Sequence, residues 1–313
     1  MQIASDIWRS AKRWRVLSLG PVSIIYRMRR TVHVSNNHRR QLIRKVKGLF
    51  RFRAQNLKVQ MSRQGAPVGI APQTHIPLVD TALVVGFGPG LGESVARKLA
   101  ESGMHVALVA RNAERIDPFA RGLEDLTTAT VRAYACDATH ESSVKSVFAL
   151  VSKDLGTPSL VIYSLQGSAR CRALDVELAA FEEYWRQNCL GAFIVAREAA
   201  RRMLALERGT IVLIGSTSGM LARSDHLTLA VGKFGLRALA HVLARELGHR
   251  GIHVVHLVID ADIKENEQYG PEVPQADPDD LADLIYSLHR QPRSAWTSEI
   301  DVRPWNEKFW EHC

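Results

Sequence analysis

Short apolar runs alternate with longer stretches of mixed polarity along the chain from about residue 81 to residue 302. The first run, Thr81–Val85, is apolar at almost every position, which is typical of a strand buried on both faces of a parallel sheet. Glu93–Ser102, the stretch that follows, has the length and composition of a helix. The same alternation predicts further strands at His105–Ala110, Thr130–Ala135, Ser159–Tyr163, Thr210–Ile214, His253–Val258 and Ser298–Val302. It predicts further helices at Ala113–Leu123, Glu141–Leu155, Phe181–Leu206, Ala230–Leu247 and Asp279–His289.

Strands that alternate with helices indicate right-handed βαβ crossovers, and a series of such units builds a doubly wound parallel sheet. We therefore predict a single α/β domain over residues 78–313, because no break in the pattern divides it. Residues 1–77 are predicted to be a basic, disordered leader and a linker. The linker is recognised by Pro67, Gly69, Pro72 and Pro77.

The charge of the chain is concentrated in its first part. The whole chain has 41 Lys plus Arg and 32 Asp plus Glu, for a net charge of +9, and its 46% hydrophobic content argues against complete disorder. Residues 1–63 hold 16 of the basic residues and one acidic residue, which leaves 25 basic and 31 acidic residues in the remainder. The first part is thus +15 and the body is −6. Because the body has no basic excess with which to line a groove for a polyanion, we expect no nucleic-acid partner.

The basic leader is open to several interpretations. Trp8, Trp14 and the stretch His38–Phe50, which could form a basic amphipathic helix, fit an organellar presequence, a membrane-surface helix or a nucleic-acid arm. The alternative is a disordered leader, or upstream sequence outside the working protein, with Met61 as the natural start of the compact unit. We favour this alternative and do not expect the leader to contact a membrane surface.

The cysteines indicate a reducing compartment. Cys136, Cys171, Cys189 and Cys313 form neither a CxxC pair nor a Cys/His spacing, so we predict no metal site. Scattered thiols in a chain of this length are typical of ordinary buried cysteines. No apolar run reaches the ~18 residues of a membrane span, and Val16–Tyr26 lacks the cleavage site of a signal peptide. We therefore expect a cytoplasmic protein, or an organellar (mitochondrial) one if the leader is a presequence.

A glycine-rich turn, Gly86–Gly92, follows the first predicted strand and leads into a helix. Glycine is needed there because the turn uses backbone angles closed to other residues and because a diphosphate must approach the backbone closely. The helix that follows directs its amide ends and the positive end of its dipole at that anion. A GxGxxG pattern alone is weak evidence, but its place between a strand and a helix supports a dinucleotide site. The residues predicted to contact the cofactor are Gly86, Gly88, Gly90, Leu91 and Gly92.

The spacing of Gly86, Gly90 and Gly92 resembles the TGxxxGxG fingerprint of the short-chain dehydrogenase/reductase family, with Val85 in place of the family's threonine. The resemblance extends over residues 78–303. It implies a Rossmann-type fold and a nicotinamide cofactor. It also implies oxidoreductase activity on the carbonyl or alcohol group of a small molecule.

Two residues at the ends of the next strands bear on the choice of cofactor. Arg111 follows the second strand, where an acid would bind the ribose 2′-hydroxyl of NAD and a basic residue suits the 2′-phosphate of NADP. Arg111 therefore favours NADP(H), with NAD(H) as the alternative. The resemblance implies that Asp137, at the end of the third strand, contacts the adenine. Asp137 could also be a helix N-cap.

The residues that the family uses for catalysis are only partly present. Asn188 matches the helix asparagine that holds a proton-relay water in family members. Ser216, within Ile214–Gly219, takes the place of the catalytic serine of the ISSxxG segment, which polarises the substrate oxygen by hydrogen bonding. Lys233 matches the lysine of the YxxxK motif, which bonds the nicotinamide ribose. Tyr163–Gly167 departs from the family's NNAG, which stabilises the sheet beside the cofactor.

Leu229 occupies the position of the family's catalytic tyrosine, and no tyrosine lies between Glu207 and Gln268. In the family, this tyrosine is the proton donor and acceptor, and the neighbouring lysine lowers its pKa. A leucine cannot transfer a proton, and general acid–base catalysis contributes about 10²–10⁴-fold. The nearest substitutes along the sequence are His226 and Tyr163, each of which could instead face solvent or the core.

The C-terminal part resembles an atypical branch of the family. The family's Pro-Gly pair is absent from Ile259–Glu265, which follows the strand His253–Val258. Gln291–Thr297, Glu299 and Arg303–Trp305 match the ending of that branch, whose members commonly lack the tyrosine. We therefore interpret the missing tyrosine as a trait of the lineage.

Two functions fit this sequence. The first is an NADP(H)-dependent oxidoreductase acting on a small-molecule substrate, with water or an unassigned group as the proton source. The second, which Leu229 favours, is a nucleotide-binding protein without redox turnover, acting as a sensor or scaffold. The resemblance also implies a homo-oligomer formed by pairing of Phe181–Leu206 and Ala230–Leu247. The loops around Gly167–Glu177 and Lys264–Asp277 contain no residue that identifies a substrate.

Overall fold

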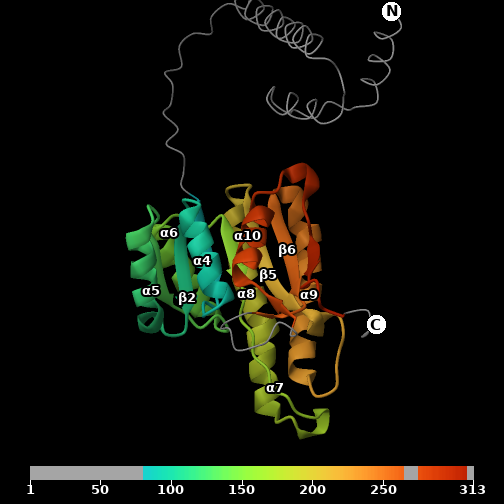
Figure 1. Cartoon of the computed structure of the whole chain (residues 1–313). Helices are drawn as coiled ribbons and strands as arrows, with labels where there is room; N and C mark the ends of the chain where they lie inside the picture. Colours follow the sequence, from blue (N-terminus) through green and yellow to red (C-terminus); the bar gives the residue numbers. More distant parts are fainter. Residues whose placement is uncertain (1–79, 264–273, 309–313) are drawn as a thin grey trace, which may run out of the picture. The chain divides into compact units, whose positions relative to one another are not determined.

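The structure, a computed structural model, describes residues 80–263 and 274–308 (Figure 1). The predicted leader and linker, residues 1–77, and most of the loop Lys264–Asp277 lie outside this part of the chain. Within it, seven parallel strands form one sheet in the order β3-β2-β1-β4-β5-β6-β9. The strands are β1 (Thr81–Val85), β2 (His105–Ala110), β3 (Val131–Ala135), β4 (Leu160–Tyr163), β5 (Gly209–Ser216), β6 (Ile252–Ile259) and β9 (Glu299–Val302). The predicted doubly wound α/β fold is confirmed.

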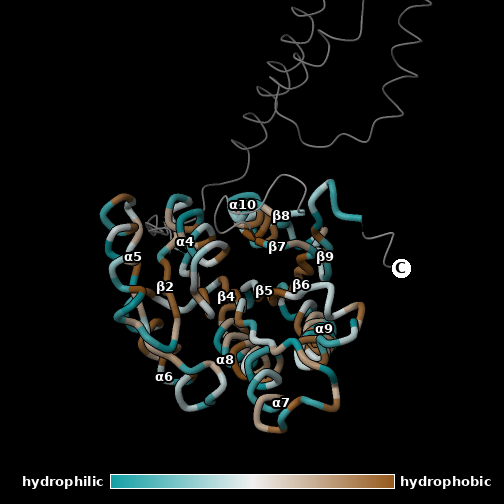
Figure 2. The backbone as a smooth tube through the Cα atoms, turned by 60° about the horizontal axis from the view of Figure 1, so that its bottom comes forward, coloured by the Kyte–Doolittle hydropathy of each residue, from teal (hydrophilic) through white to brown (hydrophobic). Residues whose placement is uncertain are grey.

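Helices cover both faces of the sheet, as Figure 2 shows in a view along the layers. One face packs against α6 (Glu141–Asp154), α8 (Gly191–Leu204) and α9 (Leu227–Leu247). The other packs against α4 (Leu91–Glu101), α5 (Ala113–Leu126) and α10 (Pro278–His289). All five residues of β1 are buried, because a central strand between two helical layers has no solvent-facing side.

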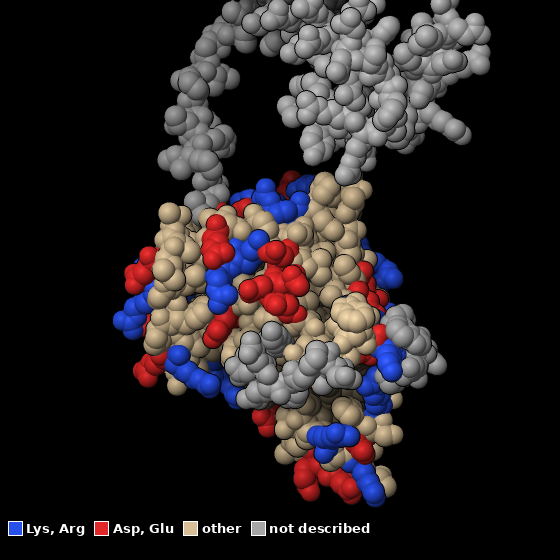
Figure 3. Space-filling model, viewed as in Figure 1, with Lys and Arg blue, Asp and Glu red and all other residues tan. Residues whose placement is uncertain are grey.

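Charged side chains of both signs are interspersed on the face formed by α4 and α10 (Figure 3). Arg97 of α4 pairs with Asp279 of α10 at 3.5 Å, and Lys98 pairs with Asp283 at 2.5 Å. Most of these side chains are exposed, and exposed ion pairs contribute little stability. The packing of the two helices therefore depends on their buried apolar residues, such as Leu99 and Ile285.

The predicted strands are all present, and their ends differ from prediction by at most two residues. Three helices begin earlier than expected, α4 at Leu91, α9 at Leu227 and α10 at Pro278, and the helix predicted from Phe181 begins at Leu178. A two-residue parallel pair, β7 (Asp262–Ile263) with β8 (Gln275–Ala276), was not predicted. Strands this short carry no periodic signal in the sequence.

The helix predicted over Phe181–Leu206 is three segments. It consists of α7 (Leu178–Trp185), a π-helical segment at Arg186–Leu190, and α8. None of the residues of α7 is buried, and this helix extends beyond the end of the sheet (Figure 1). A π-helical segment adds a residue to the turn and frequently lies at a functional site. Here it places Asn188 in the interior.

Among the described residues, the stretch Leu227–Arg250 has the length and mean hydropathy of a membrane-spanning helix, although the sequence pattern predicted no such run. This is weak evidence, because a helix that covers a sheet passes the same test. The apolar character of α9 is explained by its packing on the sheet, where Leu236 and Ala240 belong to the core.

Candidate active site

The glycine-rich turn adopts the conformation that its composition predicts. Gly86 and Gly90 have positive φ angles of 90° and 72°, which side chains other than glycine rarely adopt. A Cβ atom on Gly86 would also lie 2.7 Å from the backbone nitrogen of Leu165. A Cβ on Gly88 would meet nothing within 4 Å, so the backbone there is open to a ligand. The turn ends at Gly90, which precedes the first residue of α4.

A cleft of about 740 Å³ lies at the carboxyl ends of β1, β2, β3 and β4. Its volume is in the range of roughly 300–1,000 Å³ that small-molecule sites occupy. The strand order reverses between β1 and β4, which is where ligands bind in doubly wound sheets. The lining comprises Gly86–Pro89 of the turn, Arg111 and Asn112 after β2, Cys136–Thr139 after β3, Ser164–Gln166 after β4, and Glu183, Arg186 and Gln187.

The end of β2 presents positive charge to this cleft. Arg111 is exposed and makes no hydrogen bond or ion pair with the rest of the described chain. Asn112 caps α5 by accepting a hydrogen bond from the backbone nitrogen of Arg115 at 3.2 Å. Arg115 also lines the cleft and was not identified from the sequence. Its only sequence signal is its place in the first turn of the helix after Arg111.

Asp137 lines the cleft and also stabilises the chain around it. Its Oδ1 accepts hydrogen bonds from the backbone nitrogen and the hydroxyl of Thr139, at 2.9 and 2.7 Å. Partial burial acts to raise the pKa of Asp137, but the bonds from Thr139 and the contact with His140 together hold the pKa below its ordinary value. His140, and not Asp137, is the N-cap of α6, so Asp137 closes the turn just before it.

Ser164 joins β4 to the glycine-rich turn. Its hydroxyl lies 3.2 Å from the carbonyl oxygen of Val85 and 3.1 Å from that of Gly86, and it donates its single hydrogen between them. Although this segment departs from the family's NNAG, Ser164 still makes a polar contact between the end of β4 and the turn. The sequence analysis did not find this role, because a serine in a loop carries no specific signal.

Asn188 is fully buried, and both of its polar side-chain atoms bind Gly167. Its Nδ2 donates to the Gly167 carbonyl oxygen at 2.6 Å, and its Oδ1 accepts from the Gly167 nitrogen at 3.2 Å. A Cβ atom on Gly232 would lie 2.4 Å from the Cβ of Asn188, so this glycine lets α9 approach closely. Asn188 thus holds the loop after β4 against the π-helical segment and α9.

Ser216 and Lys233 lie beside the ends of β5 and β6 and do not line the 740 Å³ cleft. The Oγ of Ser216 is buried and has no hydrogen-bond partner among the described residues. Lys233 is 1% exposed, and its Nζ donates to the carbonyl oxygen of Ile214 at 2.9 Å. Burial lowers the pKa of Lys233 to about 8. Leu229, one helical turn before Lys233, is buried as well.

The residues predicted to contact the cofactor therefore fall into two groups. Gly86, Gly88, Arg111 and Asp137 line the cleft together. Gly90, Leu91 and Gly92 form the turn's junction with α4, where Leu91 is 7% exposed and packs in the core. The open backbone at Gly88 and the guanidinium of Arg111, which has no partner in the described part of the chain, fit a nicotinamide dinucleotide, which carries a diphosphate and ribose groups.

Neither sequence candidate for a substitute proton donor reaches this cleft. Tyr163 is fully buried, its hydroxyl donates to the Gln187 carbonyl oxygen at 2.5 Å, and burial raises its pKa. His226 precedes α9 and its Nδ1 lies 2.8 Å from the carbonyl oxygen of Ser224. Tyr163 is therefore a core residue, and His226 belongs to the loop that begins α9.

The sequence and fold agree with those of known proteins. A family model described as short chain dehydrogenase matches residues 80–262. An uncharacterised oxidoreductase of Staphylococcus epidermidis is 25% identical over 226 residues, which cover 71% of this chain and 96% of that protein. A D-threitol dehydrogenase of Mycolicibacterium smegmatis is 30% identical over 173 residues, 55% of this chain and 66% of that one.

Solved structures show the same similarity. A short-chain dehydrogenase from Rhodopseudomonas palustris is 31% identical, covers 72% of this chain and 99% of its own, and superposes with a TM-score of 0.64. A metagenomic short-chain oxidoreductase in complex with NADP is 25% identical, covers 72% of this chain and 98% of its own, and has a TM-score of 0.65. The protein belongs to the short-chain dehydrogenase family of oxidoreductases, on a Rossmann-type NAD(P)-binding fold.

Proposed function

We propose that the protein is an NADP(H)-dependent oxidoreductase that interconverts a carbonyl and an alcohol on a small molecule. The observation that carries the choice of cofactor is the lining of the cleft after β2, which contains Arg111 and Arg115 and no carboxylate. A guanidinium binds phosphate oxygens through paired, charge-assisted hydrogen bonds. An NAD site would instead use an acid at the strand end for the 2′-hydroxyl. NADP in the similar metagenomic enzyme supports the same choice.

Three residues are assigned to the reaction on this proposal. Bound NADPH supplies the hydride that reduces the carbonyl carbon. Ser216 polarises the substrate oxygen through its buried Oγ, which has no hydrogen-bond partner among the described residues. Lys233 bonds the nicotinamide ribose, and Asn188 holds the Gly167 loop beside the site. Water is the proton source, because Leu229 cannot donate a proton and Tyr163 is bonded within the core.

A second candidate is a nucleotide-binding protein without redox turnover. The observation that favours it is the environment of Lys233. In the family, the lysine acts beside a tyrosine, whereas here Leu229 fills that position and the lysine Nζ bonds the backbone of β5. Such a site retains the means to bind a dinucleotide and lacks the side chain that transfers the proton.

The proposals are tested by titrating the full chain with NADPH and with NADH, followed by a panel of carbonyl and alcohol substrates. We expect NADPH to bind at least tenfold more tightly than NADH, and NADPH oxidation in the presence of a carbonyl substrate. Tight NADPH binding with no turnover on any substrate would select the second candidate. Absence of NADPH binding at millimolar concentration would reject both.

We also propose that the protein is a homo-oligomer. Several large apolar side chains on the outer surfaces of α7, α8 and α9 are more than a third exposed, and these helices correspond to the long helices predicted to pair. Sedimentation of the full chain beside Phe234→Glu tests this, and an unchanged monomer in both would refute it. The side chains are Trp185, Phe193, Val231, Phe234 and Val242.

For location, we propose the cytoplasm, or a mitochondrion if the basic leader is a presequence. Imaging of a C-terminally tagged full chain distinguishes the two. Secretion of the chain into the medium would contradict both.

A further inference from the structure

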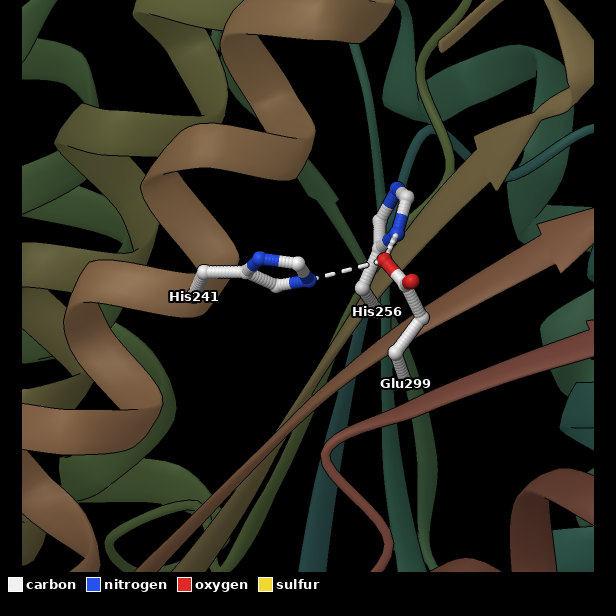
Figure 4. Close-up of side chains that lie close together, drawn as sticks. All are labelled: His241, His256 and Glu299. Carbon is white, nitrogen blue, oxygen red and sulfur yellow. Dashed lines mark hydrogen bonds and ion pairs between the residues drawn. The ribbon is translucent and has the colours of Figure 1, made fainter. Parts of the chain in front are cut away.

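Glu299 is the centre of a polar cluster that joins three elements outside the cleft (Figure 4). Arg237 of α9 donates to both of its carboxylate oxygens, from Nε to Oε2 at 2.8 Å and from Nη2 to Oε1 at 2.7 Å. His241 of α9 and His256 of β6 also reach Oε2, at 2.8 and 2.9 Å. The side chain of Glu299 is 26% exposed, and that of His256 is fully buried.

The cluster has three atoms that could ligate a metal, since His241, His256 and Glu299 offer theirs within 4.8 Å of one another. Arg237 argues against a cation there, because its guanidinium already binds both carboxylate oxygens and would repel a second positive charge. The bond from Arg237 is also the main cause that lowers the pKa of Glu299 to about 2. Both carboxylate oxygens of Glu299 are therefore occupied by bonds that link α9 and β6 to β9.

The residues of α9 in this cluster continue a line that starts at Lys233. Lys233, Arg237 and His241 are spaced four residues apart, so they lie on one face of the helix. Each bonds the sheet at a fixed point: Lys233 at the Ile214 carbonyl of β5, and the other two at Glu299 of β9. These directional bonds at three successive turns add to the apolar packing of α9 in fixing the position of the helix along its axis.

The cluster also touches the strand segment that leads to Ser216. A Cβ atom on Gly215 would lie 2.3 Å from Nε2 of His256, so the imidazole occupies the space that a side chain at 215 would fill. The family's ISSxxG segment has a serine at this position. Because Gly215 of β5 has no side chain, the imidazole ring of His256 from β6 can occupy this space.

We propose that Glu299 is a positioning residue for the active site. It sets the position of Lys233 through Arg237 and His241, and the position of Ser216 through His256 packed on Gly215. This inference rests on the proposed function, in which Lys233 bonds the cofactor ribose.

The test compares the full chain with Glu299→Gln, which keeps the side-chain shape and removes the charge. Glu198→Gln is the matched control, because Glu198 also pairs with an arginine, Arg202 at 2.8 Å, but within a single helix. NADPH affinity is measured from pH 6.5 to 10. The wild-type affinity should fall as pH rises through about 8, where Lys233 loses the charge that strengthens its bond to the ribose.

In Glu299→Gln, we expect NADPH affinity at pH 7 to be roughly fivefold weaker or more, the lower end of typical coupling between sites. The midpoint of the pH dependence should also move from about 8 towards the ordinary lysine value of 10.5. Burial is the sole cause of the lowered pKa of Lys233, so this movement would report a lysine that has become less buried. Loss of the negative charge of Glu299 would not by itself raise the pKa of Lys233.

Two results would overturn the inference. One is a Glu299→Gln protein that melts at a lower temperature but keeps the wild-type affinity and midpoint, which makes Glu299 purely structural. The other is an equal change in Glu198→Gln. Arg237→Lys, which retains the charge but not the paired bonds, should show the same midpoint shift if Glu299→Gln does not fold. A wild-type chain that fails to bind NADPH refutes the proposed function instead, and the two failures are thereby distinguished.

Discussion

Lys233 donates a hydrogen bond from its Nζ to the carbonyl oxygen of Ile214 at 2.9 Å. The lysine is buried, and Ile214 lies two residues before Ser216 on β5. The bond thus ties the helix and the strand that carry two of the proposed active-site residues. Burial, which disfavours the charged ammonium, lowers the pKa of this lysine to about 8.

Replacing Lys233 with methionine should change how stability depends on pH. The folded chain releases the Lys233 proton at a pH of about 8, whereas the unfolded chain keeps it up to about 10.5. Unfolding between these values takes up a proton, so the wild-type stability rises with pH there, by up to about 3 kcal/mol in total. Lys233→Met should lack this rise. Urea unfolding at pH 8 and pH 10 measures it, with the exposed Lys145→Met as the control. Equal slopes in wild type and Lys233→Met would contradict the prediction.

Replacing Arg111 with alanine should weaken NADPH binding and leave NADH binding nearly unchanged. A hydrogen bond to a charged group is worth about 1.5–3 kcal/mol, so the NADPH dissociation constant should rise by roughly 10–150-fold. Isothermal titration with both cofactors measures the difference. Arg121→Ala is the matched control, because Arg121 lies on α5, the helix that follows Arg111, and pairs with Asp117 outside the cleft. A parallel loss of NADH affinity would show that Arg111 does not discriminate between the two.

Substitutions of two glycines of the turn should separate an effect on folding from an effect on NADPH binding. Gly88→Val should leave the melting temperature close to the wild-type value, because a Cβ atom at this position meets nothing within 4 Å, but it should abolish NADPH binding by extending a side chain into the cleft. Gly86→Ala should instead destabilise the fold by about 1–3 kcal/mol, since it combines a positive φ with a clash against Leu165. Thermal melts with and without NADPH measure both. If the Gly88→Val protein still binds NADPH, the diphosphate does not bind at Gly88.

Restoring the tyrosine should increase turnover if proton transfer limits the reaction. Leu229→Tyr puts a phenol one helical turn from Lys233, and general acid–base catalysis contributes about 10²–10⁴-fold. NADPH oxidation by a carbonyl panel measures kcat in both proteins. Leu229→Phe is the control, because it has the same ring without the hydroxyl. Equal gains in the two variants would mean that the ring, and not proton transfer, is responsible.

Only part of the lining of the cleft could be predicted from the sequence. Gly86, Gly88, Arg111 and Asp137 could be found because each follows a strand, and the ends of parallel strands meet at one edge of the sheet. Glu183 and Gln187 also line the cleft, but they belong to a helix whose path depends on the π-helical segment at Arg186–Leu190. A single continuous helix was predicted over this stretch, because the apolar positions alone did not reveal the wider turn.

Tyr163 and His256 show the same limit for individual side chains. Tyr163 was considered as a proton donor from its distance along the chain, but the pleat of β4 directs it into the core. His256 carried no signal, because its partner Glu299 is 43 positions away along the chain, and His241, which bonds the same carboxylate, is 15 positions away on another element.

The sequence by itself determined the strands, the order of helices and the glycine-rich turn, because these depend on local polarity and on backbone angles that only glycine adopts readily. It also carries the prediction that Leu229 stands in place of the family's tyrosine. The tertiary structure decided which polar groups meet: Ser164 with the turn, Lys233 with Ile214, and Arg237 with Glu299. Such contacts depend on the register of the sheet and the rotation of each helix on it, and these are set by the packing of the whole core.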